Sequence, residues 1–104
     1  MLFRSAIALA QAQLAAGDAA AARSTLQRTI NPTERLQLLA LGAKAHYFLG
    51  EADRATGDDA SAQRHYRDAV RLLDQIRSGD GDGPFLRADF GSIYEKATQR
   101  AGER

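Results

Sequence analysis

Side chains able to bind a metal or move a proton are few in this chain of 104 residues. Its two histidines, His46 and His65, are too few and too separate in the sequence to predict a metal site. We expect each of them to have an ordinary core or surface role. Because the chain has no cysteine, a disulfide, a thiolate metal site and a cysteine nucleophile are excluded.

The stretch Asp80-Gly81-Asp82-Gly83 has the composition of the start of a calcium-binding loop. The later ligands are missing, since the twelfth position of such a loop would be Gly91 rather than a glutamate. A flexible glycine loop also cannot hold Asp80 and Asp82 in the fixed geometry of a catalytic pair. The chain has no Ser-His-Asp spacing, nucleophile elbow or phosphate-binding glycine loop. We therefore predict no catalytic residue, no cofactor and no metal, and we expect that the chain is not an enzyme.

One predicted helix carries polar side chains at helical spacing on a single face: Lys44, Tyr47, Glu51 and Arg54. Such a face could hold an extended or helical peptide through charge-assisted hydrogen bonds. The alternative is an ordinary charged face in contact with solvent.

Composition indicates one globular domain, with 44% apolar and 26% charged residues. A net charge of +1 and the absence of a dense basic block give no reason to expect binding to nucleic acid or to an anionic membrane. No apolar run reaches the roughly 18 to 20 residues that span a bilayer. Residues 1–12 imitate a secretory signal, but their apolar centre is shorter than the usual ~7 to 15 residues. We expect a cytoplasmic protein.

Apolar residues recur at helical spacing in four successive segments, so we expect an all-α fold. The first two helices are predicted at residues 3–16 and 19–30. The third is predicted at 32–56, with Asn31 as its N-cap and Pro32 in its first turn. The fourth is predicted at 59–77.

Glycine and aspartate mark the breaks between these helices. Gly17 and Gly57 suit left-handed C-terminal positions, while Asp18, and Asp58 or Asp59, can cap the helices that follow. Residues 78–84 break all periodicity and are predicted to form a loop. A weaker amphipathic helix is expected from about residue 84 to 100, with Phe85, Phe90 and Tyr94 on a face that caps the stack.

The two predicted helix pairs match at an offset of 40 residues. The matched positions are Gly17-Asp18 with Gly57-Asp58, Ala22 with Ala62, Leu26 with Tyr66, Thr29 with Ala69, Leu9 with Leu49, and Ala10 with Gly50. Repetition of this kind predicts stacked helical hairpins. The second pair closely resembles a tetratricopeptide repeat, with Leu49-Gly50, Gly57, Ala62, Tyr66 and Ala69 in that family's spacing. His46 and Asp53 replace aromatic residues common in the family, and the offset is longer than its usual ~34 residues.

The resemblance implies a right-handed superhelix of two hairpins, residues 3–30 and 32–77. A Gly/Asp loop at 78–84 and a capping helix within 85–104 would follow. In this family ligands lie along the concave face made by the first helix of each pair. The matching positions are Arg4, Ile7, Gln11, Leu14, Lys44, Tyr47, Glu51 and Arg54, of which we predict Arg4, Gln11, Lys44, Tyr47, Glu51 and Arg54 to bind peptide.

The function implied is a non-catalytic scaffold that binds a protein or peptide partner. The alternative is a structural or oligomerisation tail of a larger enzyme or transcription regulator. Residues 72–77 and 87–95 are similar to repeat tails of some bacterial multidomain regulators and protein kinases. Two repeats are fewer than the roughly three needed for stability, so upstream repeats or self-association are expected. Residues 2–5 match the translation of a common sequencing adapter, which suggests the carboxyl end of a longer protein.

Overall fold

The computed structural model describes residues 2–36, 38–80 and 90–102, with side chains over 5–36, 38–78 and 92–102. The described residues form five α-helices and no β-strand: α1 (Leu2–Ala15), α2 (Ala19–Arg35), α3 (Leu39–Ala55), α4 (Asp59–Asp80) and α6 (Phe90–Ala101). The all-α prediction is therefore confirmed. None of the described helices combines the length and apolar character needed to cross a bilayer.

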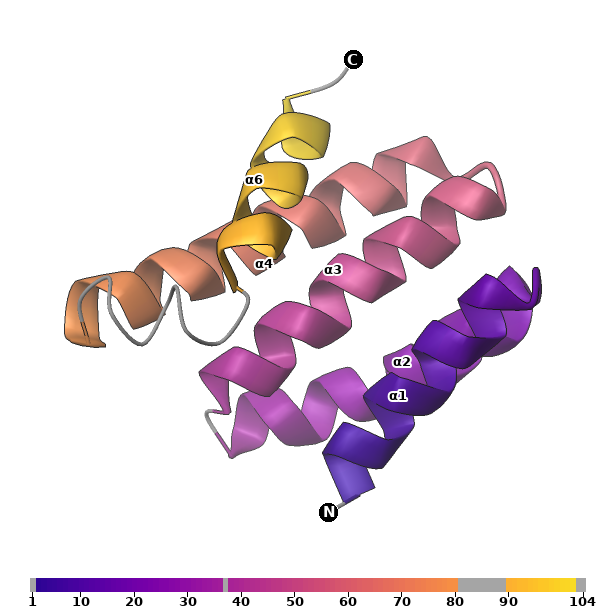
Figure 1. Cartoon of the computed structure of the whole chain (residues 1–104), viewed down its shortest axis with the longest axis horizontal. Coiled ribbons are helices and arrows are strands. Elements are labelled where there is room, and N and C mark those ends of the chain that lie inside the picture. The colour runs from indigo at the N-terminus through magenta and orange to yellow at the C-terminus, as the bar shows by residue number, and fades with distance from the viewer. Residues whose placement is uncertain (1, 37, 81–89, 103–104) are drawn as a thin grey trace.

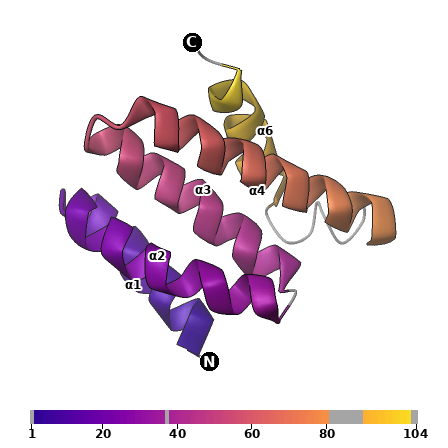
Figure 2. The ribbon, with the colours of Figure 1, turned by 180° about the vertical axis from the view of Figure 1, so that it is seen from behind.

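The central helix of the bundle is α3, which lies between the pair α1–α2 and the pair α4–α6 (Figure 1). Neighbouring helices run antiparallel, α3 packs along α2 and touches α1, and α6 packs along α4 and touches α3. The views from the two sides place α1 and α6 on one face and α2 and α4 on the other (Figures 1 and 2). A radius of gyration of 12.8 Å is close to the ~13 Å of a compact domain of this length.

The turns at Gly17 and Gly57 have the predicted left-handed backbone, with φ angles of 84° and 89°. In each turn, the residue after the glycine donates its N–H to a carbonyl five residues back, at 2.8 Å in both. The same aspartates then cap the next helix, because Asp18 accepts from the N–H of Ala21 and Asp58 from the N–H of Ser61. The two predicted turns and caps are confirmed.

The predicted boundary at Asn31-Pro32 is wrong. Helix α2 continues through Pro32 to Arg35, and α3 begins at Leu39 rather than at residue 32. A proline inside a helix costs about 3 kcal/mol, since it removes a hydrogen bond and crowds the preceding turn. Burial of Ile30 and Thr33 against the neighbouring helices offsets this cost, and the Thr33 hydroxyl donates to the carbonyl of Ile30 at 2.7 Å.

The chain after α2 turns without a side-chain cap. Leu36 donates its N–H to the carbonyl of Pro32, and Leu38 donates to that of Thr33. Leu38 is the N-cap residue of α3 and makes no side-chain capping bond.

The second half of the chain also differs in its boundaries. Helix α4 extends to Asp80, beyond the predicted end at residue 77, and α6 is described from Phe90 rather than from about residue 84. The predicted loop residues 81–84, together with Phe85, lie outside the described residues. Ala97 of α6 is fully buried, and Ile93 packs against the apolar residues of α3 and α4.

Small residues of α3 allow α4 to come close. A methyl group on Gly50 would lie 2.8 Å from a ring carbon of Tyr66, while one on Gly42 would lie 3.4 Å from Leu72. His46, between these two glycines, contacts α4 as well. The row Gly42, His46 and Gly50 on α3 is therefore part of the surface on which α4 packs, and this packing sets the geometry of the polar residues described next.

Candidate functional site

Three of the predicted peptide-binding residues lie around one hollow between α1 and α3. Its volume is about 470 Å³, and its lining residues are Gln11, Leu14, Ala15, Tyr47, Phe48, Glu51 and Ala55. Leu14 and Phe48 pack against the buried residues below, so the floor is apolar and the rim is polar. The structure thus brings Gln11, Tyr47 and Glu51 together.

The other predicted residues do not line this hollow. Arg54 borders a separate hollow of about 340 Å³, formed with the start of α4 and Arg100 of α6. Lys44 lies two turns before Glu51 on α3 and is half-buried. Arg4 belongs to α1, but its side chain is outside the described side chains. Arg54 therefore lines a different hollow from Gln11, Tyr47 and Glu51.

Tyr47 and Glu51 have structural partners of their own. Tyr47 is only 6% exposed and its ring lies against those of Phe48 and Tyr66. Burial, with a further effect from the charge of Glu51, raises the pKa of Tyr47 to about 12. Glu51 accepts a hydrogen bond from the Tyr66 hydroxyl at 2.9 Å and pairs with Arg100 at 3.0 Å. Glu51 therefore joins α3 to α4 and α6.

A second group of polar residues lies where α2, α3 and α4 meet. The Nδ1 atoms of His46 and His65 are 3.1 Å apart, and the rings stack with centroids separated by 5.3 Å. The expectation that the two histidines are separate is wrong in space, because the antiparallel packing of α3 and α4 places them opposite each other. Burial and the neighbouring His46 lower the pKa of His65.

Carboxylates surround this histidine pair. Glu34 of α2 lies 3.2 Å from Nε2 of His46, and Asp53 of α3 lies 3.7 Å from Nε2 of His65. Asp68 of α4 lies 3.8 Å from Nδ1 of His46. We call these five residues the histidine cluster: Glu34, His46, Asp53, His65 and Asp68.

Asp53 is the most buried of the acidic residues in the cluster, with 1% of its side chain exposed. Arg23 of α2 approaches one of its oxygens at 2.9 Å, but neither carboxylate oxygen has an aligned hydrogen bond. Loss of hydration raises the pKa of Asp53, and the charge of Arg23 opposes this shift. Arg23 also reaches Asp58 at 3.5 Å, so it links α2 to both sides of the turn at Gly57.

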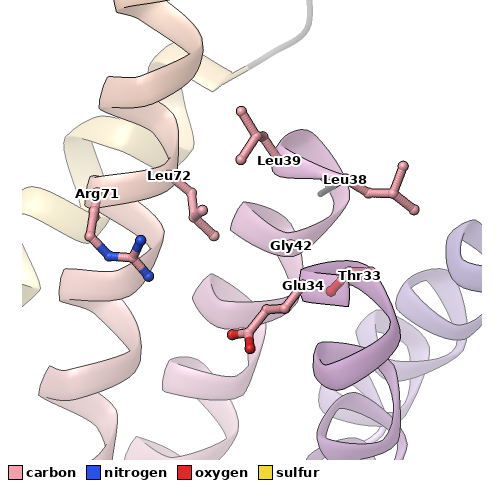
Figure 3. A pocket seen from close by; sticks show the side chains of 7 residues that line it. All are labelled: Thr33, Glu34, Leu38, Leu39, Gly42, Arg71 and Leu72. Atoms are coloured by element: carbon pink, nitrogen blue, oxygen red, sulfur yellow. The ribbon is translucent and has the colours of Figure 1, made fainter. Parts of the chain in front are cut away.

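A hollow of about 310 Å³ lies beside the histidine cluster and shares Glu34 with it (Figure 3). Leu38, Leu39 and Leu72 form its apolar walls, and Gly42 and Thr33 contribute to its lining (Figure 3). Glu34 and Arg71 come to it from α2 and α4.

The histidine cluster was missed because sequence distance was taken for spatial distance. One signal could have found it. His46 lies between Gly42 and Gly50, whose lack of a side chain lets another helix come close, and His65 precedes Tyr66, which packs on Gly50. His65 and Asp68 are three residues apart and therefore share a helix face.

Comparisons of the chain with protein-family models, with curated proteins and with solved structures find no match.

Proposed function

We propose that this chain is a non-catalytic protein-interaction module of the helical-repeat type, similar to tetratricopeptide repeats, and that it binds a peptide between α1 and α3. The observation that carries the proposal is the hollow there, with an apolar floor and a rim that includes Gln11 and Glu51. Peptide grooves combine these features, because apolar anchors supply binding energy and polar groups fix orientation.

The arrangement of the helices supports this proposal. The turns at Gly17 and Gly57 are alike in backbone angle and hydrogen bonding. In addition, α6 packs on α4 in the way that α3 packs on α2, each also touching the first helix of the preceding pair. Such a succession of like contacts is expected of stacked hairpins, in which α1, α3 and α6 form one face.

A peptide that fits would insert an apolar side chain between Leu14 and Phe48. Its backbone would hydrogen-bond the amide of Gln11. Lys44 and Arg54 of α3, which lie outside the hollow, would contact its flanking residues. Glu51 would keep its contacts with Tyr66 and Arg100 and would present its remaining carboxylate surface to the peptide.

The test begins with selection from a random peptide library on the purified chain, followed by titration of the best synthetic peptide. Ala55→Arg places a long side chain over the hollow from an exposed position. We expect this variant to bind the peptide at least about tenfold more weakly. Ala20→Arg, at an exposed position of α2, adds the same charge elsewhere and serves as the control. Equal affinity of Ala55→Arg and the wild-type chain would refute the proposal.

A second candidate function, self-association through the outer face of α1, is favoured by one observation. Leu9 is 52% exposed, whereas Leu49, its counterpart at the offset of 40, is 1% exposed against α2. Sedimentation at increasing concentration distinguishes the two functions. A dimer that Leu9→Lys dissociates, with no peptide binding at the hollow, would favour self-association.

A further inference from the structure

The histidine cluster contains three groups able to bind one metal ion. His46 comes from α3, while His65 and Asp68 come from α4, one turn apart. One potential ligand atom from each, a ring nitrogen or a carboxylate oxygen, lies within 4.8 Å of the other two. Imidazole nitrogen together with a carboxylate is a donor set that suits zinc and similar divalent transition metals.

The positions of the carboxylates determine which ring nitrogens are available. Nε2 of His46 faces Glu34 at 3.2 Å, and Nε2 of His65 faces Asp53 at 3.7 Å. Glu34 accepts a hydrogen bond from His46 at this distance, which places the ring proton of His46 on Nε2. The negative charge of Asp53 favours the same tautomer in His65. In neutral rings this leaves two bare Nδ1 atoms facing each other at 3.1 Å. Their lone pairs repel unless a proton or a metal cation lies between them.

The distance between these nitrogens suits a metal. Two imidazole nitrogens bound at about 2.0–2.1 Å to a tetrahedral zinc ion are about 3.3 Å apart. The Nδ1 atoms of His46 and His65 are 3.1 Å apart, and Oδ2 of Asp68 is 3.8 Å from the first of them. The other oxygen of Asp68 faces Arg71 at 3.7 Å, so Oδ2 is the oxygen that faces His46.

The charge of the site points to a cation as well. Glu34 and Asp68 place two carboxylates beside the histidines. Asp53 adds a third, whose charge Arg23 balances at 2.9 Å although neither of its oxygens has an aligned hydrogen bond. A histidine bound to metal commonly donates its other N–H to a carboxylate, which fixes the ring and raises its basicity. Glu34 and Asp53 occupy the positions of such partners.

We propose that His46, His65 and Asp68 bind a divalent transition-metal ion, with zinc as the best fit, and that Glu34 and Asp53 orient the two imidazoles. The metal joins α3 to α4 through its ligands and draws α2 in through Glu34. It holds the second helix pair together and leaves a fourth coordination position for water. This inference is independent of peptide binding at the α1–α3 hollow.

The experiment uses the full chain without a histidine tag, freed of metal by a chelator. Zinc sulfate is titrated in competition with a chromogenic chelator, and cobalt(II) is added separately to record visible absorption bands of a tetrahedral site. We expect one zinc per chain, tetrahedral cobalt bands and a higher melting temperature with zinc. His65→Ala should weaken zinc binding by more than about tenfold and abolish the increase in melting temperature.

Two further variants separate metal binding from folding. Asp68→Asn alters a partly exposed ligand without opening a cavity, so the variant should fold. Its affinity for zinc should nevertheless be lower than that of the wild-type chain. Glu95→Gln, at an exposed carboxylate of α6, is the matched control and should bind zinc as the wild-type chain does. Circular dichroism shows whether each variant is folded.

Three outcomes would overturn the proposal. The first is the absence of saturable zinc binding by the wild-type chain. The second is equal zinc affinity in the wild-type chain and folded His65→Ala. The third is a cobalt spectrum that His65→Ala and Asp68→Asn leave unchanged. With no metal bound, the pair would be a simple N–H···N hydrogen bond between the two rings.

Discussion

Gly50 is the position at which α3 and α4 come closest. Three ring carbons of Tyr66 lie 2.8 to 3.0 Å from where a methyl group would stand. Tyr66 cannot easily move away, since it is 2% exposed and its hydroxyl donates to Glu51. A glycine in mid-helix costs about 0.5–1 kcal/mol relative to alanine, and here the close packing of the tyrosine offsets that cost.

Gly50→Ala should therefore destabilise the protein, because the loss from overpacking, about 1–3 kcal/mol, exceeds the gain in helix propensity. Gly42→Ala is the matched control on the same face of α3. Its methyl group would meet Leu72 at 3.4 Å, an ordinary contact, so this variant should gain about 0.5–1 kcal/mol. Urea unfolding of both variants measures the difference. Equal changes in the two would show that the Gly50–Tyr66 contact has no special role.

Leu9 and Leu49, which are 40 residues apart, show how the position of a helix in the bundle decides how much a leucine contributes to stability. Leu49 is 1% exposed between α3 and α2, and Leu9 occupies the equivalent position on α1, where it is 52% exposed. Leu49→Ala should lower the free energy of unfolding by about 2–5 kcal/mol. Leu9→Ala should change it by less than about 0.5 kcal/mol in the monomer.

Thermal or urea unfolding at low protein concentration checks this pair of substitutions. A large loss of stability in Leu9→Ala under those conditions would mean that a contact covers the outer face of α1.

At the scale of the helices, the Asp58 cap connects a turn to the pH dependence of stability. The Ser61 N–H donates to Asp58, and this hydrogen bond holds the pKa of Asp58 below its ordinary value of 3.8. A carboxyl group whose pKa is lower in the folded state stabilises the protein above its unfolded pKa. That contribution is lost as the pH falls through the lower, folded pKa.

Asp58→Ala should therefore be less stable than the wild-type chain at neutral pH, with the difference shrinking as the pH falls below about 3.8. Asp58→Asn keeps an acceptor for the cap and should lose less at neutral pH. Asp59→Asn, at the exposed neighbouring position, is the control for removal of a charge. The free energies of unfolding of these variants and of the wild-type chain are measured over the acid range. A difference between Asp58→Ala and the wild-type chain that stays constant with pH would contradict the role given to the Asp58 carboxylate.

Helix α2 shows that a local sequence signal does not always determine where a helix begins or ends. Asn31-Pro32 is a good start signal, and sequence reasoning placed a helix boundary there. In the structure the residues on either side, Ile30 and Thr33, are buried against the bundle, and the helix continues. The preference of three or four residues was outweighed by contacts with helices that are distant in the chain.

At the scale of the whole molecule, Arg23 connects the helix pair α1–α2 to the helix pair α3–α4. It extends from α2 to Asp53 at the end of α3 and to Asp58 at the start of the next helix. Because Asp53 is 1% exposed and Arg23 is 37% exposed, the pair is only half accessible to water. Removing the cation would leave a carboxylate buried without compensation.

Arg23→Met should accordingly destabilise the protein by about 2–3 kcal/mol, below the value for a fully buried pair because Arg23 is partly hydrated. The double variant Arg23→Met, Asp53→Leu should recover most of that loss, since no unpaired charge remains. A double-mutant cycle by urea unfolding measures the coupling. Strictly additive effects would show that the two residues do not depend on each other.

The sequence by itself determined the local architecture of this protein. Gly17 and Gly57 end helices in a left-handed conformation, Asp18 and Asp58 begin the next ones, and the apolar stripes of the helices face the core. These features depend on backbone chemistry and on residues within a few positions, so a single sequence contains them. Tertiary structure alone decided that α2 continues through Pro32, that Arg54 lines a different hollow from Gln11 and Glu51, and that His46 lies against His65. Each of these depends on the register between packed helices, where contacts between residues distant in the chain outweigh local preference.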